Sequence, residues 1–309
     1  MFLGSYHIRM PIGKYGHGSY SITYLFYVMI KNLKKYVTAV IFLFCTSGCA
    51  SSYYSYRMVT TSPAERMPRK AFTLIQNVIS VRACMSQSDD KEKICHSGKV
   101  TTNSSGLFIG RSSIDDTIAY VLTAGHSCDT KTFKDRFGSA GVETEILAQN
   151  MTAITYYGKS HPATIVKIET QYDMCLLQIH GISHHPRSVS VAEEGPRPGE
   201  RVYNLAAPLG IFNSKMVITF EGLFAGYNEE GYALYSLPTK PGSSGSAVFN
   251  SSGEVIGMIF AGFTRIENIA ITSPQSALRT FIKNNMALGE MALFSRQKIQ
   301  QQLIIERLR

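Results

Sequence analysis

The sequence holds a histidine, an aspartate and a serine in local settings that suit proton transfer and nucleophilic attack. His126 follows the small residues that end Leu122–Gly125, and Asp173 comes immediately before an apolar run. Ser244 lies within Pro241–Phe249, with glycine two residues before it and one after it. A serine hydroxyl becomes an effective nucleophile when an imidazole takes its proton and a carboxylate fixes the imidazole tautomer. Together the three residues predict acyl-transfer chemistry.

Each of these residues has a simpler interpretation when it is taken alone. A histidine after a strand is more often structural, an aspartate there often caps a turn, and a Gly/Ser segment can be a flexible loop. The combination and its order make the catalytic interpretation specific. The remaining question is which elements would position the three side chains.

Short strands are predicted to build the body of the chain from about Ala71 onward. Runs rich in β-branched and aromatic residues alternate with clusters of Gly, Asn, Ser and Pro. The predicted strands are Thr73–Val81, Ser105–Ile109, Ile118–Leu122, Ala163–Glu169, Met174–Ile179, Arg201–Ala206, Met216–Phe220, Ala233–Leu237, Ala247–Phe249, Val255–Phe260 and Ile269–Ile271. Such a pattern indicates a barrel or sandwich. After Thr272 the apolar spacing becomes helical, and we expect Ser273 as N-cap and Pro274 in the first helical turn.

The order His126, Asp173, Ser244 resembles that of the chymotrypsin-like serine proteases. Asn204–Gly210 is similar to a strand and loop of the bacterial HtrA proteases, and Pro241–Phe249 to the staphylococcal glutamyl endopeptidases. The resemblance to a trypsin-like serine protease of this bacterial type covers residues 72–285. It implies an all-β fold of two six-stranded antiparallel β-barrels, followed here by a C-terminal α-helix.

The same resemblance assigns roles to individual residues. Ser244 would attack the peptide carbonyl, His126 would move the proton, and Asp173 would orient His126. The N–H groups of Gly242 and Ser244 would form the oxyanion hole. The expected substrate-binding strand consists of Ile259, Phe260, Ala261 and Gly262. The predicted reaction is hydrolysis of a protein or peptide through an acyl-enzyme, with no cofactor and no metal.

Several positions depart from the family pattern. Ser243 stands where the pancreatic enzymes have an aspartate that pairs with a new N-terminus, and Ile259 where the glutamyl endopeptidases have histidine. Phe260 replaces a Ser or Thr that lies near the catalytic aspartate in many relatives, which questions the support of Asp173. The six residues before Ser244 include no acid. We therefore expect a small or medium apolar residue at P1, before the scissile bond.

The formal net charge of +9 could suggest a nucleic-acid partner, but its location argues otherwise. The excess positive charge lies in residues 1–49 and 275–309, and bases and acids balance between them. A neutral body offers no basic groove, so no nucleic-acid partner is expected.

The first 49 residues resemble an export signal. Three positive residues, Lys31, Lys34 and Lys35, precede the apolar run Tyr36–Phe44. Small residues then lead to Cys49, as in a bacterial lipoprotein signal, where the signal is removed and Cys49 is lipidated. Thr46 replaces the usual leucine, and an ordinary signal peptide cut near Ala50 is the alternative. Translation starting at Met29 would suit either signal. We expect an exported protein of the periplasm or cell envelope, held to a membrane by lipid.

Four cysteines remain after the signal, Cys84, Cys95, Cys128 and Cys175. An even number in an exported chain predicts two disulfides, and the sequence leaves three pairings open. Cys84 and Cys95 bracket a polar loop, whereas Cys128 and Cys175 each lie two residues beyond a predicted catalytic residue. A zinc site is disfavoured because the chain has no C-x-x-C and no H-E-x-x-H.

The predicted organisation is a leader over 1–49, a linker over 50–71, the protease domain over 72–285 and a basic helical tail over 286–309. The tail could pack on the barrels, join copies of the chain or lie on a membrane surface. Two other functions remain open. One is an inactive protease fold that serves as a binding or scaffold lipoprotein. The other is an esterase, although hydrolase elbows place the serine before a helix.

Overall fold

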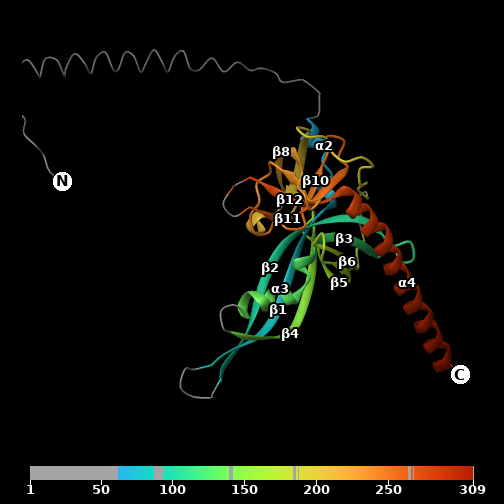
Figure 1. The fold of residues 1–309 in the computed structure, drawn as a ribbon. Coiled ribbons are helices and arrows are strands. Elements are labelled where there is room, and N and C mark those ends of the chain that lie inside the picture. The colour runs from blue at the N-terminus through green and yellow to red at the C-terminus, as the bar shows by residue number, and fades with distance from the viewer. Residues whose placement is uncertain are drawn as a thin grey trace, which may run out of the picture. The chain divides into compact units, whose positions relative to one another are not determined.

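The computed structural model describes residues 62–86, 93–138, 142–183, 186, 188–263, 266 and 268–308. The predicted leader, with Met29 and Cys49, lies outside the described residues. Two short turns, α2 (Pro63–Arg66) and η1 (Arg69–Ala71), lead into the first strand. Two closed antiparallel barrels and a long C-terminal helix follow (Figure 1).

The first barrel contains β1 to β6 in the order β1-β2-β3-β6-β5-β4. Its strands are β1 (Phe72–Ser86), β2 (Lys93–Arg111), β3 (Ile118–Ala124), β4 (Glu143–Thr155), β5 (Ser160–Glu169) and β6 (Met174–His180). All seven residues of β3 are buried, since this strand lies between β2 and β6 in the barrel core. Figure 1 shows β1, β2 and β4 running on together as a ribbon, with the helix α3 (Thr130–Gly138) beside it. The disulfide Cys84–Cys95 links β1 and β2 in this ribbon.

The second barrel contains β7 to β12 in the order β10-β11-β12-β9-β8-β7. Its strands are β7 (Arg201–Ala206), β8 (Ile218–Tyr227), β9 (Ala233–Tyr235), β10 (Ala247–Phe249), β11 (Val255–Gly262) and β12 (Ala270–Pro274). The turn η3 (Pro208–Gly210) follows β7. Buried aromatic and aliphatic side chains fill the core, among them Phe224, Tyr235, Val248 and Ile259. The predicted fold of two six-stranded antiparallel barrels is therefore confirmed.

Two elements of the first barrel were not predicted from the sequence. The outer part of β4 consists of exposed and half-buried residues with no buried face, and α3 has too few apolar residues for a helical period to be visible. The expected helix start is also corrected. Ser273 and Pro274 belong to β12, and α4 (Gln275–Leu308) begins after them. The Ser273 hydroxyl donates to the Tyr172 carbonyl at 2.7 Å, so it binds the segment before β6 and does not cap the helix.

Helix α4 is anchored to both barrels. Leu278 and Phe281 are buried in the main core cluster. Nine residues after Phe281, Glu290 accepts hydrogen bonds from the Tyr120 hydroxyl at 2.9 Å and the Ser113 hydroxyl at 2.8 Å. Burial, followed by the hydrogen bond to Glu290, raises the pKa of Tyr120 to about 12. The helix is therefore joined to β3 by a partly buried polar contact as well as by apolar packing.

Among the residues described above, no helix combines the length and hydropathy needed to cross a lipid bilayer.

Candidate active site

His126 is presented by a tight turn at the end of β3. The strand ends at Ala124, and the turn η2 (Gly125–Ser127) places His126 beside the start of β6. Gly125 donates its N–H to the Asp173 carbonyl at 2.8 Å. A Cβ at Gly125 would lie 2.7 Å from Asp173 Oδ1, so only glycine permits this approach of the two segments.

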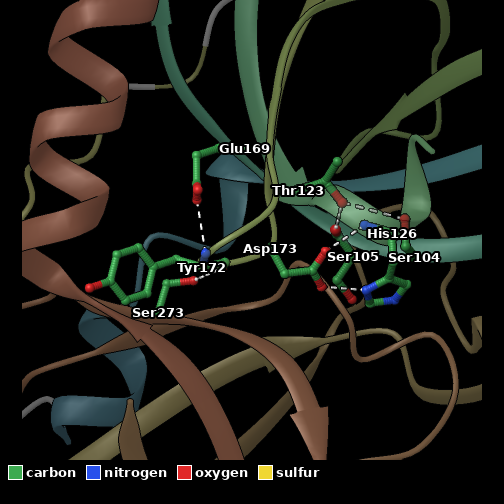
Figure 2. Close-up of polar contacts among 8 residues, drawn as sticks. All are labelled: Ser104, Ser105, Thr123, His126, Glu169, Tyr172, Asp173 and Ser273. Carbon is green, nitrogen blue, oxygen red and sulfur yellow. Dashed lines mark hydrogen bonds and ion pairs between the residues drawn. The ribbon is translucent and has the colours of Figure 1, made fainter. Parts of the chain in front are cut away.

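Asp173 contacts both the side chain and the backbone of His126 (Figure 2). Its Oδ2 lies 2.5 Å from His126 Nδ1, and its Oδ1 accepts the His126 N–H at 2.6 Å. Asp173 has φ 52°, a left-handed conformation that aspartate tolerates better than most residues. The carboxylate thus fixes the imidazole orientation and the turn that carries it. Both side chains keep some contact with solvent, at 31% and 21% exposure.

The support of Asp173 comes from its neighbours in the chain. Tyr172 donates its N–H to Glu169 at 2.9 Å and accepts the Ser273 hydroxyl at its carbonyl (Figure 2). The ring of Phe260 packs edge-on against Tyr232, with centroids 5.3 Å apart, and Tyr232 packs in the same way on Tyr172. Backbone hydrogen bonds and an aromatic chain therefore brace the aspartate turn. Sequence reasoning missed Glu169 and Tyr232, although an acid just before a turn is a local signal for such a bond.

Ser244 lies in a turn that the first barrel holds in place. The Ser105 N–H donates to the Ser244 carbonyl and the Ser105 hydroxyl to the Gly242 carbonyl, both at 2.8 Å. Thr123 in turn donates its hydroxyl to the Ser105 carbonyl at 2.7 Å (Figure 2). Gly245 has φ 83°, and a Cβ there would lie 2.1 Å from the Ser105 carbonyl oxygen. Sequence reasoning missed Ser105, because nothing local marks it.

The backbone N–H groups around Ser244 differ in whether they have a hydrogen-bond acceptor. Those of Ser243, Gly245 and Ser246 donate to the carbonyls of Lys240, Ile259 and Ser243 at 2.7–3.0 Å. Those of Gly242 and Ser244 have no hydrogen-bond acceptor among the described residues. Gly242 has φ 97°, where a side chain would be strained. The two predicted oxyanion-hole donors are thus free to bind a ligand oxygen.

His126, Gly242 and Ser244 line one cavity of about 490 Å³. The structure describes both His126 and Ser244, and no hydrogen bond joins these two residues. Such bonds are often long before substrate binds, so the arrangement is compatible with proton transfer. The three residues come from both barrels, and the cavity is where their elements meet.

The predicted substrate-binding residues all lie on β11 but differ in exposure. Ile259 is 1% exposed in the core of the second barrel, whereas Phe260, Ala261 and Gly262 are half-buried. A Cβ at Gly262 would lie 2.0 Å from the Thr239 hydroxyl oxygen. Thr239 therefore lies against the bare face of Gly262, a contact that sequence reasoning did not find. The role of the four residues stays a prediction.

Cys128 and Cys175 form the second disulfide, and both are buried at 1% and 0% exposure. Cys175 pairs with Thr123 across β3 and β6, so the bond joins the turn after His126 to the strand after Asp173. The pairings are Cys84–Cys95 and Cys128–Cys175, one of the three that the sequence left open. Within the described part of the chain, no group of three or more His, Cys, Asp or Glu could hold a metal ion.

Residues 104–258 match the family model of the trypsin-like peptidase domain, which is half of the chain. The chain therefore belongs to the trypsin-like peptidase family, and the predicted resemblance to trypsin-like proteases is confirmed. A solved serine endoprotease from Yersinia pestis is similar in fold, with a TM-score of 0.48 and 19% identity. The match covers 74% of this chain and 67% of that one. The sequence matches none of the curated proteins with which it was compared.

Proposed function

We propose that the chain is an exported serine endopeptidase that uses Ser244, His126 and Asp173. The observation that carries this proposal is the bond from Asp173 to His126, which lines the same cavity as Ser244. Because Nδ1 of His126 is engaged by the carboxylate, its proton lies there and Nε2 is left to act as base. That tautomer is the one needed to activate a serine.

The reaction begins when Ser244 Oγ attacks the scissile carbonyl and its proton passes to His126 Nε2. The carbonyl oxygen becomes negative and is bound by the N–H groups of Gly242 and Ser244, whose loss one at a time typically costs about 10²–10³ in rate. The C–N bond then breaks, and His126 gives the proton to the leaving amine. Water, activated in the same way by His126, cleaves the acyl-enzyme.

The strand β11 is the proposed binding edge for the substrate before the scissile bond. Phe260 to Gly262 would pair with the substrate backbone as an added strand. The position of Thr239 against Gly262 supports a restricted P1 site. A small or medium apolar P1 residue fits it, and a profile with cleavage mainly after Lys, Arg or Glu would contradict this specificity.

Labelling with a fluorophosphonate probe tests the catalytic proposal. The wild-type protein should react at one serine, and Ser244→Ala should abolish the reaction. Ser127→Ala is the matched control, since Ser127 lines the same cavity and should leave labelling intact. A folded wild-type protein that takes up no label would favour the binding or scaffold function. Hydrolysis of peptides would identify a protease, whereas hydrolysis of simple esters alone would identify an esterase.

Export and anchoring form the second part of the proposal. Two disulfides in the described chain support an oxidising compartment. We propose a leader over 1–49 with lipidation at Cys49, followed by a linker over 50–71. Cys49→Ala tests the lipidation, because it should release the protein from the membrane fraction. Membrane release of the wild type by salt alone would contradict lipidation. The proposed domain over 72–285 begins where β1 does, while α4 runs through the proposed start of the tail at 286.

A further inference from the structure

The cavity beside Ser244 extends away from β11. None of its lining residues belongs to β11, and several come from β1, β2, η2, α3 and the turn η3. We call it the leaving-group cleft. If residues before the scissile bond pair with β11, as the proposed function has it, residues after that bond must lie in this cleft. Its side chains should then select the leaving-group part of the substrate.

Asp129 gives the leaving-group cleft its charge. It is the sole acidic residue among the described residues that line the cleft, and neither Lys nor Arg lines it. Its Oδ1 accepts the Lys131 N–H at 2.8 Å. None of the ion pairs among the described residues includes Asp129, so no described Lys or Arg side chain is paired with it.

Asp129 is held on a rigid segment directly after His126. The Asn77 side-chain amide donates to the Ser127 carbonyl at 3.0 Å, and that of Gln149 to the Cys128 carbonyl at 2.9 Å. The Asp129 N–H donates to the Gly125 carbonyl at 3.1 Å. The disulfide from Cys128 to Cys175 adds a covalent link. A carboxylate placed this firmly loses little conformational freedom when it binds a ligand.

Apolar side chains lie around Asp129 in the same cleft. Phe133 is four residues further along the chain, and residues four apart share a helix face. Leu209 is 69% exposed at the cleft and has φ 55°. Its N–H donates to the Pro241 carbonyl at 2.6 Å, which holds the strained turn in place. Apolar surface next to one carboxylate suits a side chain with an aliphatic stem and a cationic end.

We propose that the leaving-group cleft selects a basic residue in the first two positions after the scissile bond, with Asp129 as its counter-ion. The stem of a lysine or arginine packs against Phe133 and Leu209, and its charged end reaches the Asp129 carboxylate. This inference rests on the proposed function and names its substrate class. The neutral body of the chain is consistent with local recognition of one charged residue.

The simpler role for Asp129 is to cap helix α3, and one substitution separates the two roles. Asparagine caps a helix as well as aspartate does but carries no charge. Asp129→Asn therefore keeps the cap and removes the counter-ion. Asp129→Ser, which also caps, is a second variant of the same kind.

The test measures how an acyl-enzyme divides between water and added amines. An ester substrate with a small apolar P1 residue acylates Ser244, and a dipeptide amide then intercepts the acyl group. The amine nitrogen bonds to the acyl carbon, the bond to Ser244 Oγ breaks, and the amine proton passes through His126 to Oγ. The probes are Arg-Ala-amide and Ala-Arg-amide, each compared with the same peptide carrying Glu in place of Arg.

In the wild type, at least one arginine peptide should intercept about three- to tenfold better than its glutamate counterpart. Asp129→Asn and Asp129→Ser should bring that ratio close to one, and raised salt should lower the ratio in the wild type. Equal interception by the wild type, or a ratio unchanged in a variant that still takes up the fluorophosphonate label, would overturn the inference. Failure of the wild type to take up label or ester would instead contradict the proposed function.

Discussion

Ser105 on β2 holds the turn of Ser244 on the other barrel, since its N–H donates to the Ser244 carbonyl at 2.8 Å. Its hydroxyl donates to the Gly242 carbonyl at 2.8 Å and accepts the Ala207 N–H at 3.0 Å. One fully buried serine thus joins the proposed nucleophile, a proposed oxyanion-hole residue and the residue that follows β7. The geometry of the site therefore depends on how the two barrels meet.

We expect Ser105→Ala to weaken both stability and activity. It leaves the Ala207 N–H without its acceptor and the Gly242 carbonyl without a donor, at a cost of about 1–3 kcal/mol in the free energy of unfolding. The loosened Gly242 should lower kcat more than KM changes. Urea unfolding and peptide hydrolysis measure the two effects. Ser104→Ala is the matched control, since its contact with Thr123 is long at 3.4 Å; equal losses in the two variants would contradict the assignment.

Alanine should destabilise the fold more at Gly245 than at Gly231, because Gly245 has close contacts in addition to its positive φ. Both have φ near 80°, but nothing lies within 4 Å of a Cβ at Gly231. Gly231→Ala should cost about 1–2 kcal/mol from backbone strain alone. Gly245→Ala adds the clash with the Ser105 carbonyl and should cost about 4 kcal/mol or more, or prevent folding. Thermal unfolding of the pair checks this, and similar melting temperatures would show that the turn can relax.

The two disulfides should differ in their effect on activity. Replacing Cys128 and Cys175 by alanine opens a link across 47 residues and should cost about 2–4 kcal/mol. It also frees the segments that carry His126 and Asp173, so kcat should fall. Replacing Cys84 and Cys95 affects the distal ribbon and should leave kcat within about twofold. Comparable loss of kcat in both double variants would mean that stability, and not site geometry, sets the rate.

The sequence was sufficient to propose the three catalytic residues, because each has a local mark. A strand end precedes His126, an apolar strand follows Asp173, and glycines flank Ser244. The family resemblance then supplied the number of strands and their closure into two barrels. Periodicity alone would have missed β4, whose exposed half offers no buried face to detect.

The residues that hold the site in place could not be predicted, because their hydrogen bonds join positions that lie far apart in the sequence. Ser105 and Gly242 are separated by 137 positions, and Ser273 and Tyr172 by 101. Ser273 also shows how a local rule can mislead. Ser-Pro fits a helix start, but the partly buried Tyr172 carbonyl needs a donor, and the Ser273 hydroxyl supplies it.

The contact between Glu290 and the loop after β2 should make stability depend on pH. Burial raises the Glu290 pKa, but hydrogen bonds from Ser113, Tyr120 and Ser112 outweigh it and hold the pKa below its usual value of 4.5. The contribution of Glu290 to the free energy of unfolding is thus fully present above about pH 4.5, and it is lost as the pH falls through the lowered pKa. Glu290→Gln should therefore be less stable than the wild type at neutral pH, and the difference should shrink on acidification. A difference that is constant with pH would contradict a role for the charge.

The contact between Thr239 and Gly262 predicts how P1 specificity can be changed. Thr239→Gly removes the side chain that lies against Gly262, so the space beside β11 becomes larger. We expect relative kcat/KM to shift from alanine and valine toward leucine and phenylalanine at P1, by about tenfold for one or two added methylenes. Thr239→Ser, which keeps the hydroxyl, should retain most of the original preference. A profile that is unchanged in Thr239→Gly would place the P1 residue elsewhere on the second barrel.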